Sequence, residues 1–145
     1  MTRSILALVL SSFVIACGPT LVFPGGELHG TPATTPDDWS FTEEISTIQI
    51  ETRPGDPYSV NIWAVGIDER LYIHAGANRA TWVEHLEVDP AVRARIEDRI
   101  YGLEAVRVES QAEFDVFADA YDAKYGVRPR NENVDEVYLF ALVAR

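Results

Sequence analysis

The feature that most limits the possible folds is a series of short segments rich in Ile, Val, Thr and aromatic residues. Residues of these kinds favour strands, whereas Pro and Gly between them favour turns. Residues 44–52 and 58–67 are therefore predicted to pair as a hairpin across the turn Arg53-Pro54-Gly55-Asp56-Pro57. Residues 70–75 follow a tight connection and alternate in polarity, so we expect them to complete a three-stranded antiparallel meander.

The next segments are predicted to be a helix and two more strands. Residues 80–88 have helical spacing and end before Asp89-Pro90, because a residue that precedes proline resists helical geometry. Residues 91–108 fit a helix as well as a pair of strands. We interpret them as a hairpin that turns near Asp98, in part because of the family resemblance given below.

The last segments are predicted to be a helix and a strand. Ser110 and Glu113 form a capping-box pattern at the start of the helix, and Gly126 suits the left-handed conformation that ends helices. The helix carries one apolar stripe, interpreted as core or dimer interface, of Phe114, Phe117, Tyr121 and Tyr125. Residues 136–144 are almost continuously apolar and are predicted to be the final strand. The expected order is β-β-β-α-β-β-α-β.

The N-terminus has the pattern of an exported protein. Residues 1–16 combine Arg3 with an apolar run of about 12 residues, whereas a membrane-spanning helix needs about 20. The end of this run, Val14-Ile15-Ala16-Cys17, resembles a bacterial lipoprotein box, which predicts a signal peptide over 1–16 and lipidation of Cys17. An ordinary signal peptide that contains a cysteine and a buried apolar N-terminal helix are the alternative interpretations.

Residues 17–38 are rich in Gly, Pro and Thr and are predicted to be a tether or an ordered wrapping arm. Their few apolar residues favour partial packing of this arm on the folded domain. That domain is expected to cover 39–145, starting at Trp39. The chain would then be exported and anchored by lipid to a membrane of a bacterial cell envelope.

The composition excludes several classes of protein. The 12 Lys and Arg residues against 23 Asp and Glu residues give a formal net charge of −11, the wrong sign for a protein that follows nucleic-acid phosphates. The single cysteine, Cys17, excludes an intramolecular disulfide. The three histidines lack zinc-hydrolase spacing, and there is no Gly-x-Ser-x-Gly, dinucleotide-binding or P-loop motif. No catalytic residue and no metal site is identified on these grounds.

Residues 74–82 are the segment best suited to hold a ligand. Small side chains would let a ligand approach the backbone, while Arg79, Thr81 and the N–H groups of a helix start could hold a phosphate. An ordinary turn with a solvated Arg79 and a core Trp82 explains the same residues. His74 is interpreted as a surface or partner-facing residue rather than as a base.

The order and spacing of several segments resemble one known superfamily. These segments are Ile50-Glu51-Thr52, Val60-Asn61-Ile62-Trp63, Leu71-Tyr72-Ile73, Arg79-x-x-Trp82-x-x-x-Leu86-x-x-Asp89-Pro90-x-Val92-Arg93 and the capped aromatic helix. Residues 39–145 resemble the pyridoxamine-phosphate-oxidase-like split β-barrels, and among them the deazaflavin-dependent nitroreductase branch. The resemblance implies an α+β, mainly β fold, a six-stranded antiparallel Greek-key split β-barrel with two or three short helices.

The resemblance also implies a homodimer that binds FMN or the related deazaflavin coenzyme in a groove between subunits. The residues that it implies for the coenzyme are Val60, Asn61, Ile62, Trp63, Ala75, Gly76, Asn78, Arg79, Thr81 and Trp82. Trp82 is either a wall of this groove or a core residue. The chain departs from the family pattern at His85, where asparagine is common. It also has few basic residues for a phosphate: Arg79 locally, with Arg128 and Arg130 from a late loop.

Two functions follow from the resemblance. The first is a lipid-anchored, extracytoplasmic flavin-binding protein, with reduction of a small organic acceptor by hydride transfer as the implied activity. The alternative is a non-enzymatic lipoprotein whose cofactor-less barrel binds a ligand or another protein. A carrier of a hydrophobic ligand and a haem protein that uses His74 or His85 are more distant alternatives. A groove bordered by arginines favours the first function, and a groove filled by residues 21–30 favours the alternative.

Overall fold

The computed structural model describes residues 25–145. The predicted signal peptide, Cys17 and the first part of the arm therefore lie outside the described residues. Within residues 25–145, no helix combines the length and the apolar composition needed to cross a membrane.

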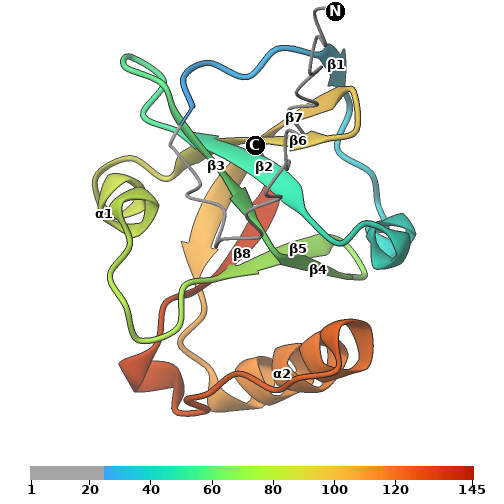
Figure 1. The fold of residues 1–145 in the computed structure, drawn as a ribbon, viewed down its shortest axis with the longest axis vertical. Helices are drawn as coiled ribbons and strands as arrows, with labels where there is room; N and C mark the ends of the chain where they lie inside the picture. Colours follow the sequence, from blue (N-terminus) through green and yellow to red (C-terminus); the bar gives the residue numbers. More distant parts are fainter. Residues whose placement is uncertain (1–24) are drawn as a thin grey trace, which may run out of the picture.

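The described residues form eight strands, two α-helices and two short 3-10 helices (Figure 1). In chain order these are β1 (Thr31–Ala33), η1 (Ser40–Glu44), β2 (Ile48–Thr52), β3 (Tyr58–Ile62), β4 (Ala64–Ile67), β5 (Arg70–His74), α1 (Thr81–Val88), β6 (Ala91–Ile96), β7 (Arg99–Arg107), α2 (Gln111–Tyr125), η2 (Val134–Glu136) and β8 (Leu139–Ala144). The expected α+β, mainly β class is confirmed. Eight strands replace the six expected, because the predicted strand 58–67 is divided at Trp63 and the arm adds β1.

The strands follow the order β3-β2-β6-β7-β8-β5-β4 in one sheet, and β1 pairs with β7. The predicted three-stranded meander is wrong, since β3 and β4 lie at the two ends of this path. The two hairpins within it are correct, because β2 pairs with β3 and β4 pairs with β5, both antiparallel. A single residue, Trp63, joins the two ends of the path, so the sheet curls back on itself into a half-barrel (Figure 1).

The turns that the sequence predicted are present. Arg53 and Glu97 adopt positive φ angles of 54° and 55° where the β2–β3 and β6–β7 hairpins turn. The hairpin interpretation of residues 91–108 is therefore confirmed over the helical one. α1 ends at Val88, directly before Asp89-Pro90.

α2 is capped at both ends. The Ser110 hydroxyl accepts a hydrogen bond from the Glu113 N–H at 3.3 Å, and Gly126 ends the helix in the left-handed conformation with φ 71°. The Glu113 carboxylate does not complete the capping box. It accepts hydrogen bonds from Arg70 at 2.7 Å and from the Tyr72 hydroxyl at 2.9 Å. The first turn of α2 is thereby attached to β5.

Two hydrophobic clusters lie on opposite faces of β4, β5 and β8. Along β5, Leu71 and Ile73 belong to the cluster inside the half-barrel, whereas Tyr72 belongs to the cluster shared with Phe114 and Phe117 of α2. β8 contributes to both clusters in the same alternating way, which explains why almost all its residues are apolar. α2 therefore covers the outer face of these strands, as Figure 1 shows below the sheet.

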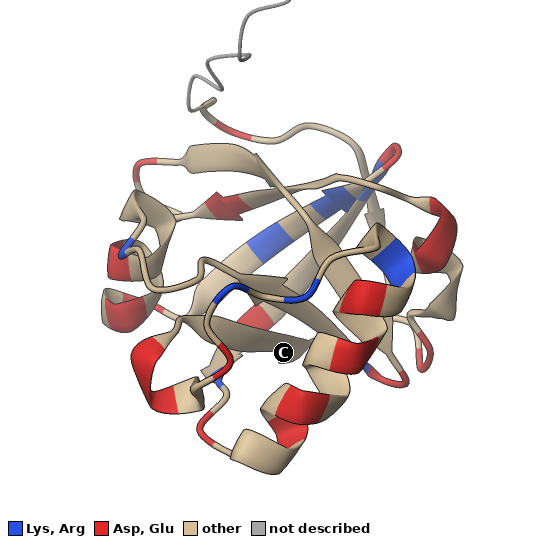
Figure 2. Cartoon of the chain, turned by 60° about the horizontal axis from the view of Figure 1, so that its bottom comes forward, with Lys and Arg blue, Asp and Glu red and all other residues tan. Residues whose placement is uncertain are grey.

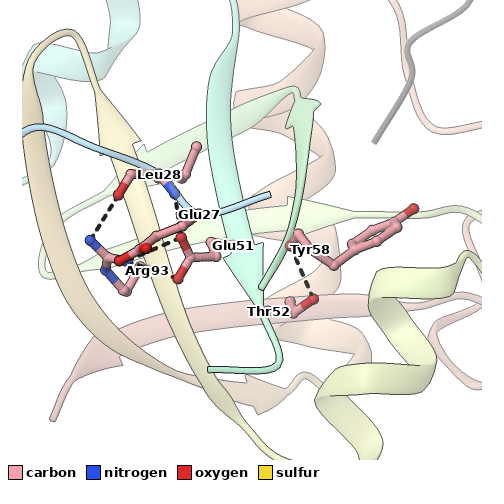
Figure 3. Close-up of polar contacts among 6 residues, drawn as sticks. All are labelled: Glu27, Leu28, Glu51, Thr52, Tyr58 and Arg93. Carbon is pink, nitrogen blue, oxygen red and sulfur yellow. Dashed lines mark hydrogen bonds and ion pairs between the residues drawn. The ribbon is translucent and has the colours of Figure 1, made fainter. Parts of the chain in front are cut away.

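The described part of the arm is held on the barrel by an ion pair between the buried Glu51 and the partly exposed Arg93 (Figure 3). Arg93 of β6 lies opposite Glu51 of β2, with 2.9 Å between Nη1 and Oε1. Both groups also bind the backbone of Leu28: Glu51 Oε2 accepts from its N–H at 2.5 Å, and Arg93 Nη2 donates to its carbonyl at 3.0 Å. Gly25 exchanges two backbone hydrogen bonds with Ser59 of β3. This segment is thus an ordered part of the barrel surface.

Candidate functional site

An open cavity of about 480 Å³ lies between β5, α2 and the loop that follows α2. Four parts of the chain line it: the β3–β4 junction, the end of β5 with its loop, the C-terminal part of α2, and the loop before η2. The lining residues are Trp63, His74, Ala75, Gly76, Ala77, Asn78, Tyr121, Val127, Arg128, Pro129, Arg130 and Asn131.

Trp63 is a fixed aromatic wall of the cavity. Its ring stacks on Tyr125 at 4.4 Å between centroids with an interplanar angle of 10°, and the side chain is still 46% exposed. The Tyr125 hydroxyl accepts a hydrogen bond from the Ala64 N–H at 3.0 Å and lies 2.9 Å from the Ala64 carbonyl. α2 therefore holds the residue that joins β3 to β4, and one flat face remains available for stacking.

A second part of the cavity wall is formed by backbone and small side chains at the end of β5. Ala75 donates its N–H to the Tyr138 carbonyl, and Tyr138 donates its N–H to the Gly76 carbonyl, both at 2.9 Å. Gly76 has a φ of 62°, a conformation that residues with a Cβ rarely adopt. With Ala77 next to it, this turn lets a ligand come close to the main chain.

His74 lies at the end of β5 among aromatic rings. Its ring centroid is 5.5 Å from that of Phe117, 6.2 Å from Tyr121 and 6.3 Å from Phe114. Its Nε2 atom is buried and has no hydrogen-bond partner within residues 25–145. Burial lowers the pKa of His74 to about 4, so the ring is neutral at neutral pH.

His74 should make the stability of this protein depend on pH. The unfolded chain takes up a proton at His74 near pH 6.5, whereas the folded chain does so only near pH 4, so stability present above pH 6.5 is lost as the pH falls. This group alone is expected to lower the free energy of unfolding by about 2 kcal/mol between pH 7.5 and pH 5. Urea denaturation of the wild type and of His74→Phe at both pH values measures it. Equal pH dependence of the two proteins would contradict the prediction.

Two arginines bring positive charge to a protein that is otherwise acidic. In Figure 2, acidic residues are spread over helices and loops, and basic positions are fewer. Arg128 is paired with Asp119 at 2.7 Å and with Glu132 at 2.5 Å, and these two carboxylates raise its pKa. Arg130 is exposed and forms no ion pair with any residue of the described range. The cavity rim therefore carries one cation whose charge these residues leave uncompensated.

The cavity brings together four of the ten residues that the resemblance implies for a coenzyme, namely Trp63, Ala75, Gly76 and Asn78. The other six do not line it. Val60, Asn61 and Ile62 lie on β3 at the end of the sheet path. Arg79 is paired with Glu87, and Thr81 is exposed at the start of α1. Trp82 is buried in the core with its ring against Phe140 at 5.9 Å, which favours the core interpretation.

From the sequence, His74 is included in the ligand segment 74–82 but its side chain is interpreted as surface or partner-facing, and Tyr121 is assigned to the core or dimer interface; the structure places both residues in the cavity wall. Polarity alternation along β5 places His74 on the same face as Tyr72, and this face is covered by α2. The apolar stripe of α2 was the available signal, because such a stripe must cover some face of the sheet. The described residues contain no group of three or more His, Cys, Asp or Glu side chains placed to bind a metal ion.

No protein-family model and no curated protein sequence matches this chain significantly. Its fold matches several solved structures. A candidate 5-nitroimidazole antibiotic resistance protein from Bacteroides thetaiotaomicron has a TM-score of 0.57 and 14% identity, covering 71% of this chain and 75% of that chain. A FAD-binding protein from Mesorhizobium loti has a TM-score of 0.51 and 14% identity, covering 71% of this chain and 83% of that chain. An F420 reductase has a TM-score of 0.51 and 15% identity, covering 73% of this chain and 91% of that chain. The chain therefore has the split β-barrel fold expected from its resemblance to pyridoxamine-phosphate-oxidase-like proteins.

Proposed function

We propose that this chain is an exported, lipid-anchored split-barrel protein that binds a flavin-type coenzyme, FMN or a deazaflavin, in the cavity beside Trp63. The observation that carries the proposal is the make-up of the cavity wall. A flat aromatic ring, a turn of small residues and two arginines surround about 480 Å³, a volume typical of sites for small molecules and cofactors. The shared fold with a FAD-binding protein and an F420 reductase supports the flavin class.

The walls of the cavity suit different parts of such a coenzyme. The exposed face of Trp63 can stack on a planar ring system, because Tyr125 already covers its other face. The Ala75-Gly76-Ala77 turn allows a ring edge to approach backbone N–H and carbonyl groups. The His74 ring also lines the cavity and is uncharged at neutral pH. A bound flavin or deazaflavin would supply hydride transfer, and the protein supplies its binding and orientation.

The position of the arm also supports a coenzyme over the non-enzymatic alternative. The arm contacts Glu51, Ser59 and Arg93, which belong to β2, β3 and β6. No residue of the described arm, 25–38, is among those that line the cavity. The cavity is bordered instead by Arg128 and Arg130. This is the arrangement expected for a protein that keeps a ligand site open.

Titration of the full-length, detergent-solubilised protein with FMN tests the proposal. Quenching of flavin fluorescence with one FMN per chain is the expected result. Trp63→Ala removes the stacking face and is expected to weaken FMN binding by roughly tenfold or more, because one aromatic contact of this kind contributes about 1 kcal/mol beyond its area burial. Val88→Ala, an exposed residue at the end of α1, is the control. A folded protein that binds neither FMN nor a deazaflavin would leave the non-enzymatic alternative in place.

A homodimer is part of the same proposal. Two apolar residues of the cavity wall, Trp63 and Val127, are 46% and 47% exposed, which is high for large hydrophobic side chains. A second subunit placed over this opening would cover them and would enclose a bound coenzyme.

Lipid anchoring rests on the lipoprotein-box pattern at Cys17. Two or three acyl chains there would hold the protein firmly on a membrane, since each buried methylene contributes about 0.8 kcal/mol. Mass spectrometry of the membrane fraction is expected to find an acylated N-terminal Cys17 in the wild type. A Cys17→Ser protein that sediments equally well with membranes would contradict this part.

A further inference from the structure

We infer that Arg130 is the residue that binds the anionic group of the cavity's ligand, and that this group is a phosphate such as that of FMN. The inference rests on the proposed function and adds to it the chemistry at one end of the ligand. It also moves the anion site away from Arg79, which the sequence had suggested, to the loop after α2.

The first argument is the state of the two arginines that line the cavity. Arg128 already contacts two carboxylates, Asp119 and Glu132, so its charge is offset within the protein. Arg130 has no carboxylate partner within residues 25–145, although the sequence holds 23 acidic residues. A guanidinium group whose N–H donors are not occupied by a carboxylate can offer two of them in parallel to a phosphate.

The second argument is that the loop is fixed on both sides of Arg130. Pro129 before it is buried, although the residues on either side of this proline are exposed. Asn131 after it donates from Nδ2 to Glu136 Oε2 at 2.9 Å, and its Oδ1 accepts the Asn133 N–H at 3.0 Å. The backbone at Arg130 is therefore held in place while its side chain stays free, which lowers the entropy cost of binding a ligand.

The third argument is that Arg79 forms an ion pair outside the cavity. Its guanidinium is paired with Glu87, and it does not line the cavity. Asn78, next to it, does line the cavity, and an asparagine amide can donate hydrogen bonds to an anion. Gly76 and Asn78 thus remain in the site that the sequence suggested, but the cation of that site is supplied by a different element.

The test compares FMN with riboflavin, which has the same ring system and lacks the phosphate. Charge-assisted hydrogen bonds to a phosphate are expected to make the wild type bind FMN about tenfold or more tightly than riboflavin. Arg130→Gln is expected to reduce this ratio to nearly one by weakening FMN binding while leaving riboflavin binding unchanged. Raising the salt concentration should weaken FMN binding to the wild type and leave riboflavin unaffected.

Arg79→Gln is the matched control, because it removes an arginine of equal charge outside the cavity. It is expected to keep the wild-type ratio. An Arg130→Gln protein that keeps its preference for FMN, or an Arg79→Gln protein that loses it, would overturn the inference. So would a wild type that binds both flavins equally, and in that case the proposed function would stand. A folded wild type that binds neither flavin would overturn the inference, and one that also binds no deazaflavin would overturn the proposed function with it. Thermal unfolding of each variant verifies that it is folded.

Discussion

A Gly66→Ala protein is expected to lose roughly 3 kcal/mol of its free energy of unfolding, because overpacking a tight contact costs about that much. Gly66 lies in β4, directly under the first residues of η1. A Cβ atom at this position would overlap the Trp39 carbonyl oxygen and would lie 2.6 Å from both Trp39 Cβ and Thr42 Oγ1. Two of these atoms belong to a fully buried tryptophan.

The neighbours of Gly66 cannot move away easily. The Trp39 N–H donates to the Asp68 carbonyl at 2.8 Å, and the Thr42 hydroxyl donates to the Trp39 carbonyl at 2.7 Å. Trp39 itself packs its ring edge-on against Tyr101 at 5.1 Å in the core. A methyl group at position 66 would therefore push η1 and the tryptophan outward together.

Gly102→Ala is the control for this prediction. Gly102 also lies in a strand, β7, but a Cβ there meets no atom within 4 Å. Alanine at this position is expected to change the free energy of unfolding by about 1 kcal/mol at most, and in the stabilising direction. Urea denaturation of the three full-length proteins measures both effects. A Gly66→Ala protein within about 1 kcal/mol of the wild type would show that η1 is not packed as described.

Loss of Arg93 is the second change with a large expected effect. Arg93→Leu would leave the Glu51 carboxylate, which is 3% exposed, without its cation, and this is expected to cost roughly 3 kcal/mol. Removing the partner should cost less, because the Arg93 side chain is 36% exposed and can turn to water in Glu51→Leu. The double variant is expected to lose less stability than the two single variants summed.

Hydrogen exchange in the arm is a second measurement of the Glu51–Arg93 pair. The Leu28 N–H donates to Glu51, and the Leu28 carbonyl accepts from Arg93. Both Arg93→Leu and Glu51→Leu should therefore speed hydrogen exchange at the Leu28 amide. Arg95→Leu is the matched control, since Arg95 lies two residues further along β6 and faces the uncharged Gln49. It should leave Leu28 protected. An Arg93→Leu protein as stable as Arg95→Leu would show that the Glu51–Arg93 pair does not hold the arm.

Local elements were predictable because their signals are local. Pro90 ends α1, Gly126 ends α2 in a left-handed conformation, and the β6–β7 turn at Glu97 and Asp98 lies where the alternation of apolar residues indicated. The prediction of one strand over residues 58–67 was wrong because the signal that divides it is not local. Trp63 looks like one more strand residue in sequence, and the break there depends on long-range pairing, of β3 with β2 and of β4 with β5.

The sequence by itself determined the two α-helices with their ends, the β2–β3 turn, the mainly β class, and the small-residue turn at Ala75-Gly76 that became one wall of the cavity. These depend on propensities, turn chemistry and spacing within a few residues. The tertiary structure alone decided which arginine faces the cavity. Arg79 and Arg130 have the same chemistry in sequence. Arg79 pairs with Glu87 of α1, the helix that follows it. Arg130 instead lies in the loop after α2, which brings it to the cavity rim beside Trp63 and His74. Such placement follows from long-range packing of α2 on the sheet, and no local pattern encodes it.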